Sequence, residues 1–339
     1  MSSVLFVEVY MPATSKDVAR EAGVSPSTVS RAFTRPEMVD PHTRELIFTT
    51  ARRLNYRPNR AARLLSSGQT GYLGAVLPDV NNPFFASVLK GIYGAATGLE
   101  LQVLFVDFCD DEKAEDEAVT ELTPQVDAFI LCSSRLSDSA IINLHSKQPV
   151  VLVNRQAENI PYVHFDNAEG MREAYMHLLA LGHRRIGYCG GPTLSRSAQE
   201  RLNSFTEMAQ TSKAASEGIY IGEFPSTFEG GAKAADTALN QGVSAVIAYN
   251  DVMAIGMMNR LISYGIELPA DLSIIGFDDV PIAAMMSPEL TSVRLPQEEA
   301  GRLAVELAVQ ELQTHDAHSV DMPVSLQVRS STSRFQPHR

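Results

Sequence analysis

A short stretch near the start of the chain carries small hydroxyl side chains and one guanidinium group on what would be one face of a helix. Ser25 and Pro26 favour a helix start, because the serine hydroxyl can accept from first-turn amides and proline fits the first helical position. Val29 and Phe33, four residues apart, would then face inward. The polar residues left on the outer face are Ser27, Thr28, Ser30 and Arg31. Side chains of these types can hydrogen-bond base edges and phosphates in the major groove of DNA.

Two further helices are expected beside this one. Thr14 and Asp17 have the spacing of a capping box, and Gly23 supplies the backbone freedom that ends the first helix. A third helix is expected to begin near Asp40–Pro41 and to end before Arg57–Pro58. The residues expected on its buried side are Leu46, Ile47, Ala51 and Leu54. The pattern predicts an all-α three-helix unit of the helix-turn-helix type, although any glycine-interrupted helix pair would share much of it.

Charge makes nucleic-acid binding the favoured interpretation of this unit. Residues 14–68 contain 10 Lys and Arg against 5 Asp and Glu, a net charge of +5. The whole chain of 339 residues has a net charge of −12, and Glu8 is the one charged residue before Thr14, so residues 69–339 carry −16. A basic segment next to an acidic body favours local contact with phosphates, since the body is repelled by them.

Two segments resemble the DNA-binding domain and hinge of the lac repressor and galactose repressor family. They are DVAREAGVSPSTVSRAF, residues 17–33, and LNYRPNRAARLL, residues 54–65. The resemblance implies that Pro26 and Ser27 open the recognition helix and select the operator. It also implies that 58–66 is a hinge helix that folds on DNA, with Leu65 wedged into a minor-groove step, whereas the residues alone favour packing of Leu65 against the body. The residues assigned to DNA contact are Thr14, Ser25, Pro26, Ser27, Thr28, Ser30, Arg31, Asn59, Arg60, Arg63 and Leu65.

After residue 68 the sequence alternates between short apolar runs and longer helical stretches. The apolar runs, expected to be parallel strands buried on both faces, are 73–77, 103–106, 128–131, 150–153, 185–189, 245–248 and 273–277. The expected helices are 84–99, 113–122, 168–181, 196–210, 228–241 and 251–264. This alternation predicts an α/β body of two doubly wound parallel-sheet subdomains. The resemblance extends over the body and implies a periplasmic-binding-protein-like fold, in which the chain crosses between the subdomains three times.

These patterns divide the chain into four parts. Residues 1–13 are expected to be a disordered N-terminal extension, 14–57 the helix-turn-helix DNA-binding domain, 58–70 the hinge helix and linker, and 71–336 the effector-binding and dimerisation domain. The resemblance implies a first subdomain of about 71–163 plus 292–319, and a second of about 164–291 plus 320–336.

A ligand is expected in a cleft at the carboxyl ends of the strands. The polar residues that directly follow strands are Asp79, Asn81, Asn82, Asp107, Asn154, Arg155, Asn250, Asp251, Asp278 and Asp279. Motif matches to the family strengthen three of these and add Arg201, which the resemblance implies grips effector hydroxyls or carbonyls. The candidate effector-binding residues are Asp79, Phe84, Asn154, Arg201, Asn250 and Asp278. Helix capping by Asn250 and core packing of Phe84 stay open as alternatives.

Other kinds of site are not expected from the sequence. There is no GKS or GKT phosphate-binding loop, the eight histidines lack metal-ligand spacing, and no Ser, His and acid group into a triad. The three cysteines, Cys109, Cys132 and Cys189, are expected to be reduced, buried thiols. Since no run of 18 apolar residues occurs, no membrane span is expected. We predict no catalytic residue, metal or cofactor, and a cytoplasmic, nucleoid-associated location.

The resemblance and the order of the parts predict a ligand-responsive DNA-binding regulator and not an enzyme. The favoured role is a repressor of carbohydrate uptake or catabolism genes. Its expected partners are double-stranded operator DNA of near-palindromic sequence, a small-molecule effector that is a sugar or sugar derivative, and a second copy of the chain in a homodimer or larger assembly. One alternative is a corepressor-dependent regulator that responds to a purine or other small metabolite, although Arg196 stands one residue after the position, here Ser195, of an arginine in a purine-responsive member. An alternative of another class is a solute-binding protein.

Overall fold

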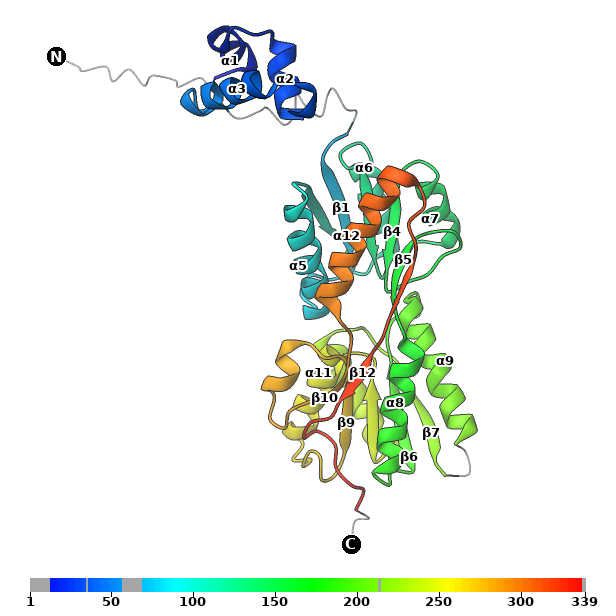
Figure 1. Ribbon diagram of the computed structural model, residues 1–339. Coiled ribbons are helices and arrows are strands. Elements are labelled where there is room, and N and C mark those ends of the chain that lie inside the picture. Colours follow the sequence, from blue (N-terminus) through cyan, green and yellow to red (C-terminus); the bar gives the residue numbers. More distant parts are fainter. Residues whose placement is uncertain (1–12, 35, 57–68, 213–214, 337–339) are drawn as a thin grey trace, which may run out of the picture. The chain divides into compact units, whose positions relative to one another are not determined.

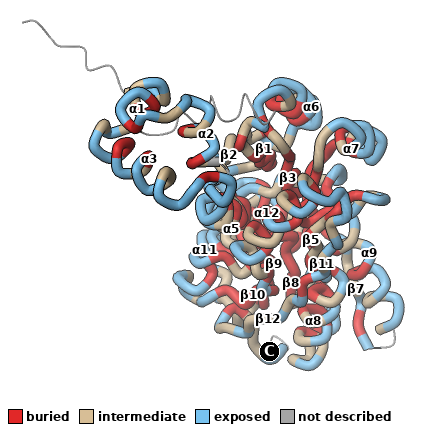
Figure 2. Tube along the Cα trace, turned by 45° about the horizontal axis from the view of Figure 1, so that its top comes forward, coloured by how far each residue is buried: buried red, intermediate tan, exposed pale blue. Residues whose placement is uncertain are grey.

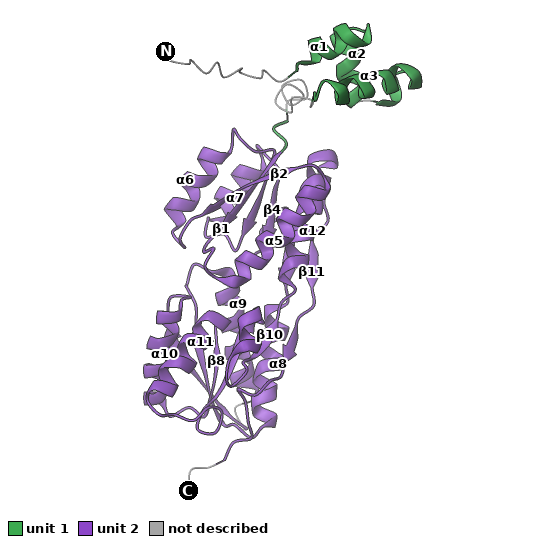
Figure 3. Ribbon diagram, turned by 90° about the vertical axis from the view of Figure 1, so that its left-hand side faces the viewer, with its two compact units in different colours: residues 1–71 green, residues 72–339 purple. Residues whose placement is uncertain are grey.

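The computed structural model describes residues 13–34, 36–56, 69–212 and 215–336. The chain divides into two compact units, residues 1–71 and 72–339 (Figure 3). Most of the predicted N-terminal extension lies outside the described residues, as does most of the predicted hinge, including Asn59, Arg60, Arg63 and Leu65.

Within its described residues, the first unit contains three helices and one short 3-10 turn. They are α1 (Ser15–Ala22), α2 (Pro26–Thr34), η1 (Pro36–Met38) and α3 (Pro41–Arg53). Thr14 and Asp17 form the expected capping box at the start of α1, and Gly23 ends it in the left-handed region, with φ at +67°. The core of the unit is formed by Val18, Ala19, Ala22, Val29, Ala32, Val39, Ile47 and Ala51.

One residue predicted for this core is on the surface. The inner face of α3 carries Ile47, Thr50 and Ala51, which are spaced by three and four residues and are all buried. Leu46 precedes Ile47 by one position, about 100° around the helix, and its side chain is 46% exposed. The prediction that Leu46 is buried was therefore wrong, because a neighbour in sequence points to another face of a helix.

The second unit contains two six-stranded sheets. Each sheet and the helices that pack on it are called a lobe, and the lobes are numbered first and second in chain order. The first sheet has the order β11-β5-β4-β3-β1-β2 and is parallel throughout. Its strands are β1 (Tyr72–Leu77), β2 (Gln102–Asp107), β3 (Ala128–Cys132), β4 (Val150–Val153), β5 (Tyr162–Phe165) and β11 (Val320–Met322). The helices that pack on it are α5 (Pro83–Gly98), α6 (Glu112–Leu122), α7 (Asp138–His145) and α12 (Gln297–Thr314).

The second sheet has the order β12-β10-β9-β8-β6-β7, and β12 is its antiparallel member. Its strands are β6 (Arg185–Gly190), β7 (Glu217–Glu223), β8 (Ala245–Ala248), β9 (Ser273–Asp278), β10 (Thr291–Arg294) and β12 (Ser325–Gln327). Its helices are α8 (Asn167–Ala180), α9 (Arg196–Thr211), α10 (Phe228–Gln241) and α11 (Asp251–Ser263), and the short η2 (Pro281–Met285) follows β9. The central strands of both sheets are buried along their length (Figure 2). The predicted fold class, an all-α head with a body of two α/β subdomains, is confirmed.

The chain crosses between the lobes three times (Figure 1). The crossings follow β5, β10 and β11, so each lies a few residues later than the predicted boundaries at 163, 291 and 319. The reason is pairing: β10 adds to β9 in the second sheet, and β11 adds to β5 in the first. All three segments mix polar and apolar residues, which do not signal a buried strand.

Two sequence expectations about burial fail at β2. This strand is at the edge of its sheet, and Phe105 is 52% exposed, so the strand is not buried on both faces. Cys109 is exposed because it lies in the turn after β2, where its φ is +52°. Cys132 and Cys189 are buried as expected, and burial raises the pKa of the Cys132 thiol to about 12.

Paired glycines let the helices on one face of each sheet approach closely. A Cβ on Gly91 of α5 would lie 2.0 Å from the carbonyl oxygen of Glu298 in α12, and Gly301 of α12 is almost as close to the backbone of α5. In the second lobe, Gly231 of α10 and Gly256 of α11 have the same relation to each other's helices. Backbones in such contact leave no room for a side chain. Within the described ranges, no helix is both long and apolar enough to cross a bilayer.

Candidate functional site

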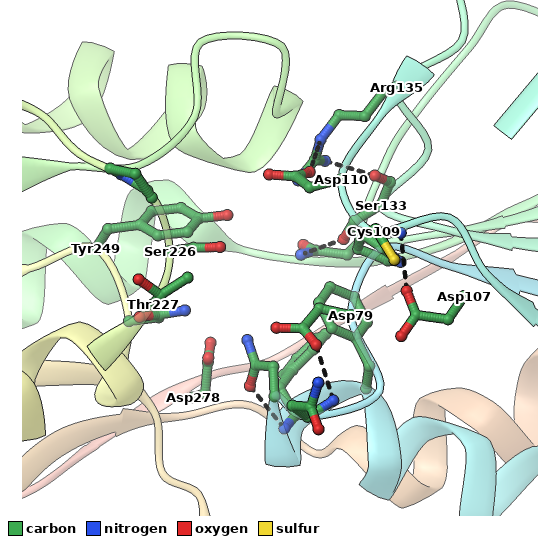
Figure 4. Close-up of a pocket in the computed structure, with 18 of the residues that line it drawn as sticks. Asp79, Asp107, Cys109, Asp110, Ser133, Arg135, Ser226, Thr227, Tyr249 and Asp278 are labelled. Atoms are coloured by element: carbon green, nitrogen blue, oxygen red, sulfur yellow. Dashed lines mark hydrogen bonds and ion pairs between the residues drawn. The ribbon is translucent and has the colours of Figure 1, made fainter. Parts of the chain in front are cut away.

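The carboxyl ends of both sheets border a cavity of about 370 Å³ between the two lobes of the second unit. Figure 4 shows side chains of the two lobes facing each other across it. The structure brings all six predicted effector residues into its lining: Asp79, Phe84, Asn154, Arg201, Asn250 and Asp278. Because strand ends of two parallel sheets converge here, residues up to about 200 positions apart share one site.

Arg201 of α9 is held rigidly by the second lobe. Its Nε donates to Oδ1 of Asn167 at 2.9 Å, and its Nη1 donates to the carbonyl of Tyr249 at 2.5 Å. The guanidinium also lies over the ring of Phe277, 3.9 Å from the centroid. Its remaining nitrogen, Nη2, lies 3.6 Å from Oδ1 of Asp278. The side chain is 2% exposed, so one donor is fixed in place beside one carboxylate.

Asp278 ends β9 and is almost fully buried. Burial raises the pKa of its carboxyl group to about 7, although Arg201 acts to lower that pKa. Asp251, at the start of α11, also has its pKa raised, by burial first and then by the nearby Asp278. The two buried acids and Arg201 therefore form one electrostatically linked group.

Asp251 and Asp279 are two further candidates from the strand-end rule. Their carboxylates bind other groups of the second lobe and do not line the cavity. Asp251 accepts from the amide of Val280 at 2.8 Å and from the hydroxyl of Ser292 at 2.6 Å, which ties α11 to the end of β9. Asp279 forms ion pairs with Arg294 and Arg329. The first aspartate of the Asp278–Asp279 pair faces the cavity and the second faces the packed edge of the lobe.

A hydrogen-bonded chain of polar residues connects the two lobes beside the cavity. Asn154 follows β4 with φ at +57° and donates from Nδ2 to the hydroxyl of Ser133 at 3.2 Å. Asn167, fully buried at the start of α8, donates to Oδ1 of Asn154 at 3.3 Å and accepts from Arg201. Asn167 also donates to Glu200, which contacts His164 at 3.0 Å. A displacement of Asn154 would thus shift Asn167 and, through it, the position of Arg201.

Two of the six residues also have the alternative roles that the sequence left open. Asn250 caps α11 by accepting from the amide of Met253 at 2.9 Å, while it lines the cavity. Phe84 is 2% exposed and packs against Phe85 and Phe165, and it also lines the cavity. Capping and packing are therefore compatible with a place at the site.

Several lining residues were missed by the sequence reasoning. Ser133 and Arg135 follow β3, and Tyr249 follows β8, so the strand-end rule could have selected them. Ser226 and Thr227 follow β7, whose mixed sequence gave no strand signal. The first three could have been found by applying the rule to every strand, and the last two required the structure.

Arg196 does not line the cavity. Its Nη2 donates to Oδ2 of Asp138 in the first lobe at 3.2 Å, and the same carboxylate accepts from Arg155 at 2.7 Å. Ser195, the neighbouring position, caps α9 by accepting from the amide of Ala198 at 3.3 Å. Arg196 therefore connects the two lobes at a place away from the ligand cavity.

In the first unit, α2 presents the expected polar face. Val29 and Ala32 are buried, and the exposed residues of the helix and its start are Ser25, Pro26, Ser27, Ser30 and Arg31. Ser25 caps the helix by accepting from the amide of Thr28, and its hydroxyl also contacts those of Ser27 and Thr28. Thr14, by contrast, is engaged in the capping box of α1. The remaining exposed cations of the described unit are Lys16, Arg20, Arg52 and Arg53.

A helix-turn-helix unit joined to a two-lobed α/β body with a polar cavity between its lobes defines a class of DNA-binding regulators. Residues 14–59 match the family described as bacterial regulatory proteins, lacI family, and residues 175–332 match the periplasmic binding protein-like domain. The chain belongs to the lac repressor family of bacterial transcriptional regulators, and it is a regulator and not an enzyme.

Similarity to individual members extends over nearly the whole chain. The HTH-type transcriptional repressor CytR of Escherichia coli (strain K12) is 33% identical over 329 residues, 94% of this chain and 96% of that protein. The lac repressor dimer bound to operator and the anti-inducer ONPF matches with a TM-score of 0.83 and 27% identity, covering 95% of this chain and 100% of that one. The transcriptional regulator CelR–cellobiose complex matches with a TM-score of 0.69 and 28% identity, covering 94% and 99%.

Proposed function

We propose that this protein represses genes of carbohydrate uptake or catabolism, binds a near-palindromic operator as a dimer, and is released by a sugar or sugar derivative. The observation that carries the effector part is the Arg201–Asp278 pair at the cavity. A fixed donor and a carboxylate acceptor 3.6 Å apart suit two adjacent hydroxyls, one accepting and the other donating. The cellobiose complex of a structural relative gives this proposal further support.

The proposed mechanism depends on the position of the cavity between the lobes. An effector that contacts Asn154 in the first lobe and Arg201 and Asp278 in the second would favour one arrangement of the lobes over another. If the operator favours the other arrangement, ligand binding releases DNA by thermodynamic linkage. Two chains would place their α2 helices in successive major grooves, as dimeric helix-turn-helix proteins do.

The other roles have less support. In the purine alternative, the additional arginine would contact the ligand, whereas Arg196 is bound to Asp138 away from the cavity. A role as a solute-binding protein would not account for the helix-turn-helix unit or for its basic charge.

The proposed effector response can be tested with the full-length protein. A thermal-shift screen against sugars, polyols, sugar acids and nucleobases should yield a compound that raises the melting temperature, because a ligand of the folded state stabilises that state. The same compound should weaken operator binding in a gel-shift titration. If the screen yields a nucleobase that strengthens operator binding, the corepressor alternative replaces our proposal.

Replacing Arg31 by alanine is expected to weaken operator binding by roughly 1–3 kcal/mol, as for loss of a base or central phosphate contact. Arg31 is exposed on α2, and its Nε donates weakly to its own helix, at 3.4 Å from the carbonyl of Ser27, so the fold does not depend on it. Gel-shift titration at fixed salt measures the loss, and thermal melting controls for stability. Unchanged affinity would remove Arg31 from the DNA contacts.

Replacing Leu65 by alanine is expected to weaken operator binding while leaving effector affinity intact, if this residue is a minor-groove wedge as the family resemblance implies. Operator affinity by gel shift and effector affinity by titration calorimetry, measured on one preparation, separate the possibilities. Equal loss of both affinities would instead mean that Leu65 packs against the body.

A further inference from the structure

We propose that the cavity accepts an uncharged polyhydroxylated effector and excludes anionic derivatives such as sugar phosphates and sugar acids. The inference narrows the effector class and rests on the proposed function for the existence of an effector. The charges that line the cavity, and the partners that those charges already have, support this selectivity.

Both guanidinium groups in the described lining are committed to protein acceptors. Arg135 donates from Nε to Oδ1 of Asp110 at 2.7 Å and from Nη1 to the carbonyl of Ser133 at 2.5 Å, and its side chain is 4% exposed. Arg201 uses two of its nitrogens on Asn167 and Tyr249 and faces Asp278 with the third. Each guanidinium thus has a carboxylate beside it, and neither offers a positive charge in excess.

Carboxylates outnumber these cations among the described lining residues. The four are Asp79, Asp107, Asp110 and Asp278, of which the last two face Arg135 and Arg201. The other two have backbone amides as the partners seen within the described ranges. Asp79 accepts from Asn81 at 2.8 Å, and Asp107 accepts from Val80 at 2.8 Å and from Cys109 at 2.9 Å. The lining therefore has an excess of negative charge.

The helix ends at the cavity offset this excess only in part. Helices α5, α10 and α11 begin at the cavity, and an open N-terminus would favour an anion. At each of them the helix's own cap occupies one first-turn amide: Asn82 accepts from Phe84, Thr227 from Gly230, and Asn250 from Met253. In addition, α5 begins with Pro83, which has no amide hydrogen to donate.

An anionic group in this cavity would be placed among carboxylates and would lose part of its contact with water. Repulsion between like charges a few ångströms apart grows as water is excluded, and burial without an opposite charge is itself costly. A hydroxyl group can donate to a carboxylate and accept from Nη2 of Arg201 without either cost. The lining thus favours neutral hydroxyl-rich ligands over their phosphorylated or oxidised derivatives.

The charge of the cavity can be measured through the labelling rates of the Cys109 thiol with charged reagents. Cys109 is the exposed one of the three cysteines and lines the cavity, whereas Cys132 and Cys189 are buried. The full-length protein would be treated with methanethiosulfonate reagents that carry a sulfonate, no charge or a trimethylammonium group. The labelling rate of each reagent is divided by its rate with free 2-mercaptoethanol, which removes differences in reactivity between the reagents. The normalised rate of the cationic reagent is then divided by that of the anionic reagent, which removes the intrinsic reactivity of the Cys109 thiol. The neutral reagent controls for steric access, and a Cys109→Ser variant controls for the site of labelling.

We expect the normalised ratio to exceed unity by about tenfold at low salt and to fall as salt is added, because salt screens the carboxylates. Asp79→Asn should reduce the ratio, since it removes one of the carboxylates that lack a cation partner. A ratio at or below unity would overturn the proposal. So would stabilisation of the protein by ribose 5-phosphate or galacturonate when ribose or galactose has no effect. Failure of the proposed function would appear differently, as absence of specific operator binding in gel shifts, which the labelling ratio does not depend on.

Discussion

Replacing Gly91 by alanine is expected to lower the free energy of unfolding by about 3 kcal/mol, the upper end of the usual cost of overpacking. The new Cβ would lie 2.0 Å from the carbonyl oxygen of Glu298 and 2.8 Å from its carbon, and both atoms are backbone of α12. A side chain could rotate away, whereas a helix backbone cannot, so α5 and α12 must separate. The effect should extend beyond the local contact, because Gly301 brings the two helices equally close from the other side.

Gly94 provides the matched control on the same helix. A Cβ there would meet nothing within 4 Å, so Gly94→Ala should be stabilising by about 0.5–1 kcal/mol through helix propensity. Urea denaturation of the two variants and the parent protein measures both effects, and their opposite signs exclude a general effect of alanine. Equal stability of Gly91→Ala and the parent would mean that α5 and α12 can move apart without losing packing energy.

The elements that the sequence predicted are those with a local signal. The apolar runs at β1, β2, β3, β4, β6, β8 and β9 are strands, and the start of α9 at Arg196 follows from the serine cap before it. Strands β5, β7, β10, β11 and β12 depend instead on pairing with a neighbour distant in sequence. The segment 162–165, Tyr-Val-His-Phe, becomes a strand because β4 and β11 flank it. Such long-range partners are absent from any local pattern.

The candidate site shows the same limit in its side chains. The strand-end rule found Asp79, Asn154 and Asp278, since the position of a residue after a strand is readable from the sequence. It could not separate Asp278, which lines the cavity, from Asp251, which is buried beneath β9. Asn167 was missed altogether, because its position at the start of α8 indicates nothing about Arg201, which comes from another helix 34 positions later. Arg201 itself was found through the family resemblance.

Replacing Asp278 by asparagine is expected to weaken effector binding roughly 100-fold, the loss of one hydrogen bond to a charged acceptor. Asparagine has nearly the same shape, so the cavity should keep its form. Operator affinity should be unchanged, because Asp278 lies in the second lobe and not in the DNA-binding unit. Titration calorimetry with the sugar identified by the thermal-shift screen measures the first quantity, and gel shift the second. Full affinity for the sugar in this variant would remove Asp278 from the site.

The pH dependence of the parent protein provides an independent check on the same carboxylate. Burial raises the pKa of Asp278 from 3.8 to about 7, so the folded protein holds this proton more tightly than the unfolded chain does. This contribution to stability is therefore full below about pH 4 and is lost as pH rises through 7. Effector binding should show the opposite trend, because an ionised Asp278 accepts from a sugar hydroxyl, so affinity should fall as pH drops below 7. Asp278→Asn should remove the trend in effector affinity and reduce the trend in stability, because Asp251, whose pKa is also raised by burial, still contributes to stability. A variant that keeps the pH dependence of both stability and effector affinity would assign them to Asp251, the other buried acid of the pair.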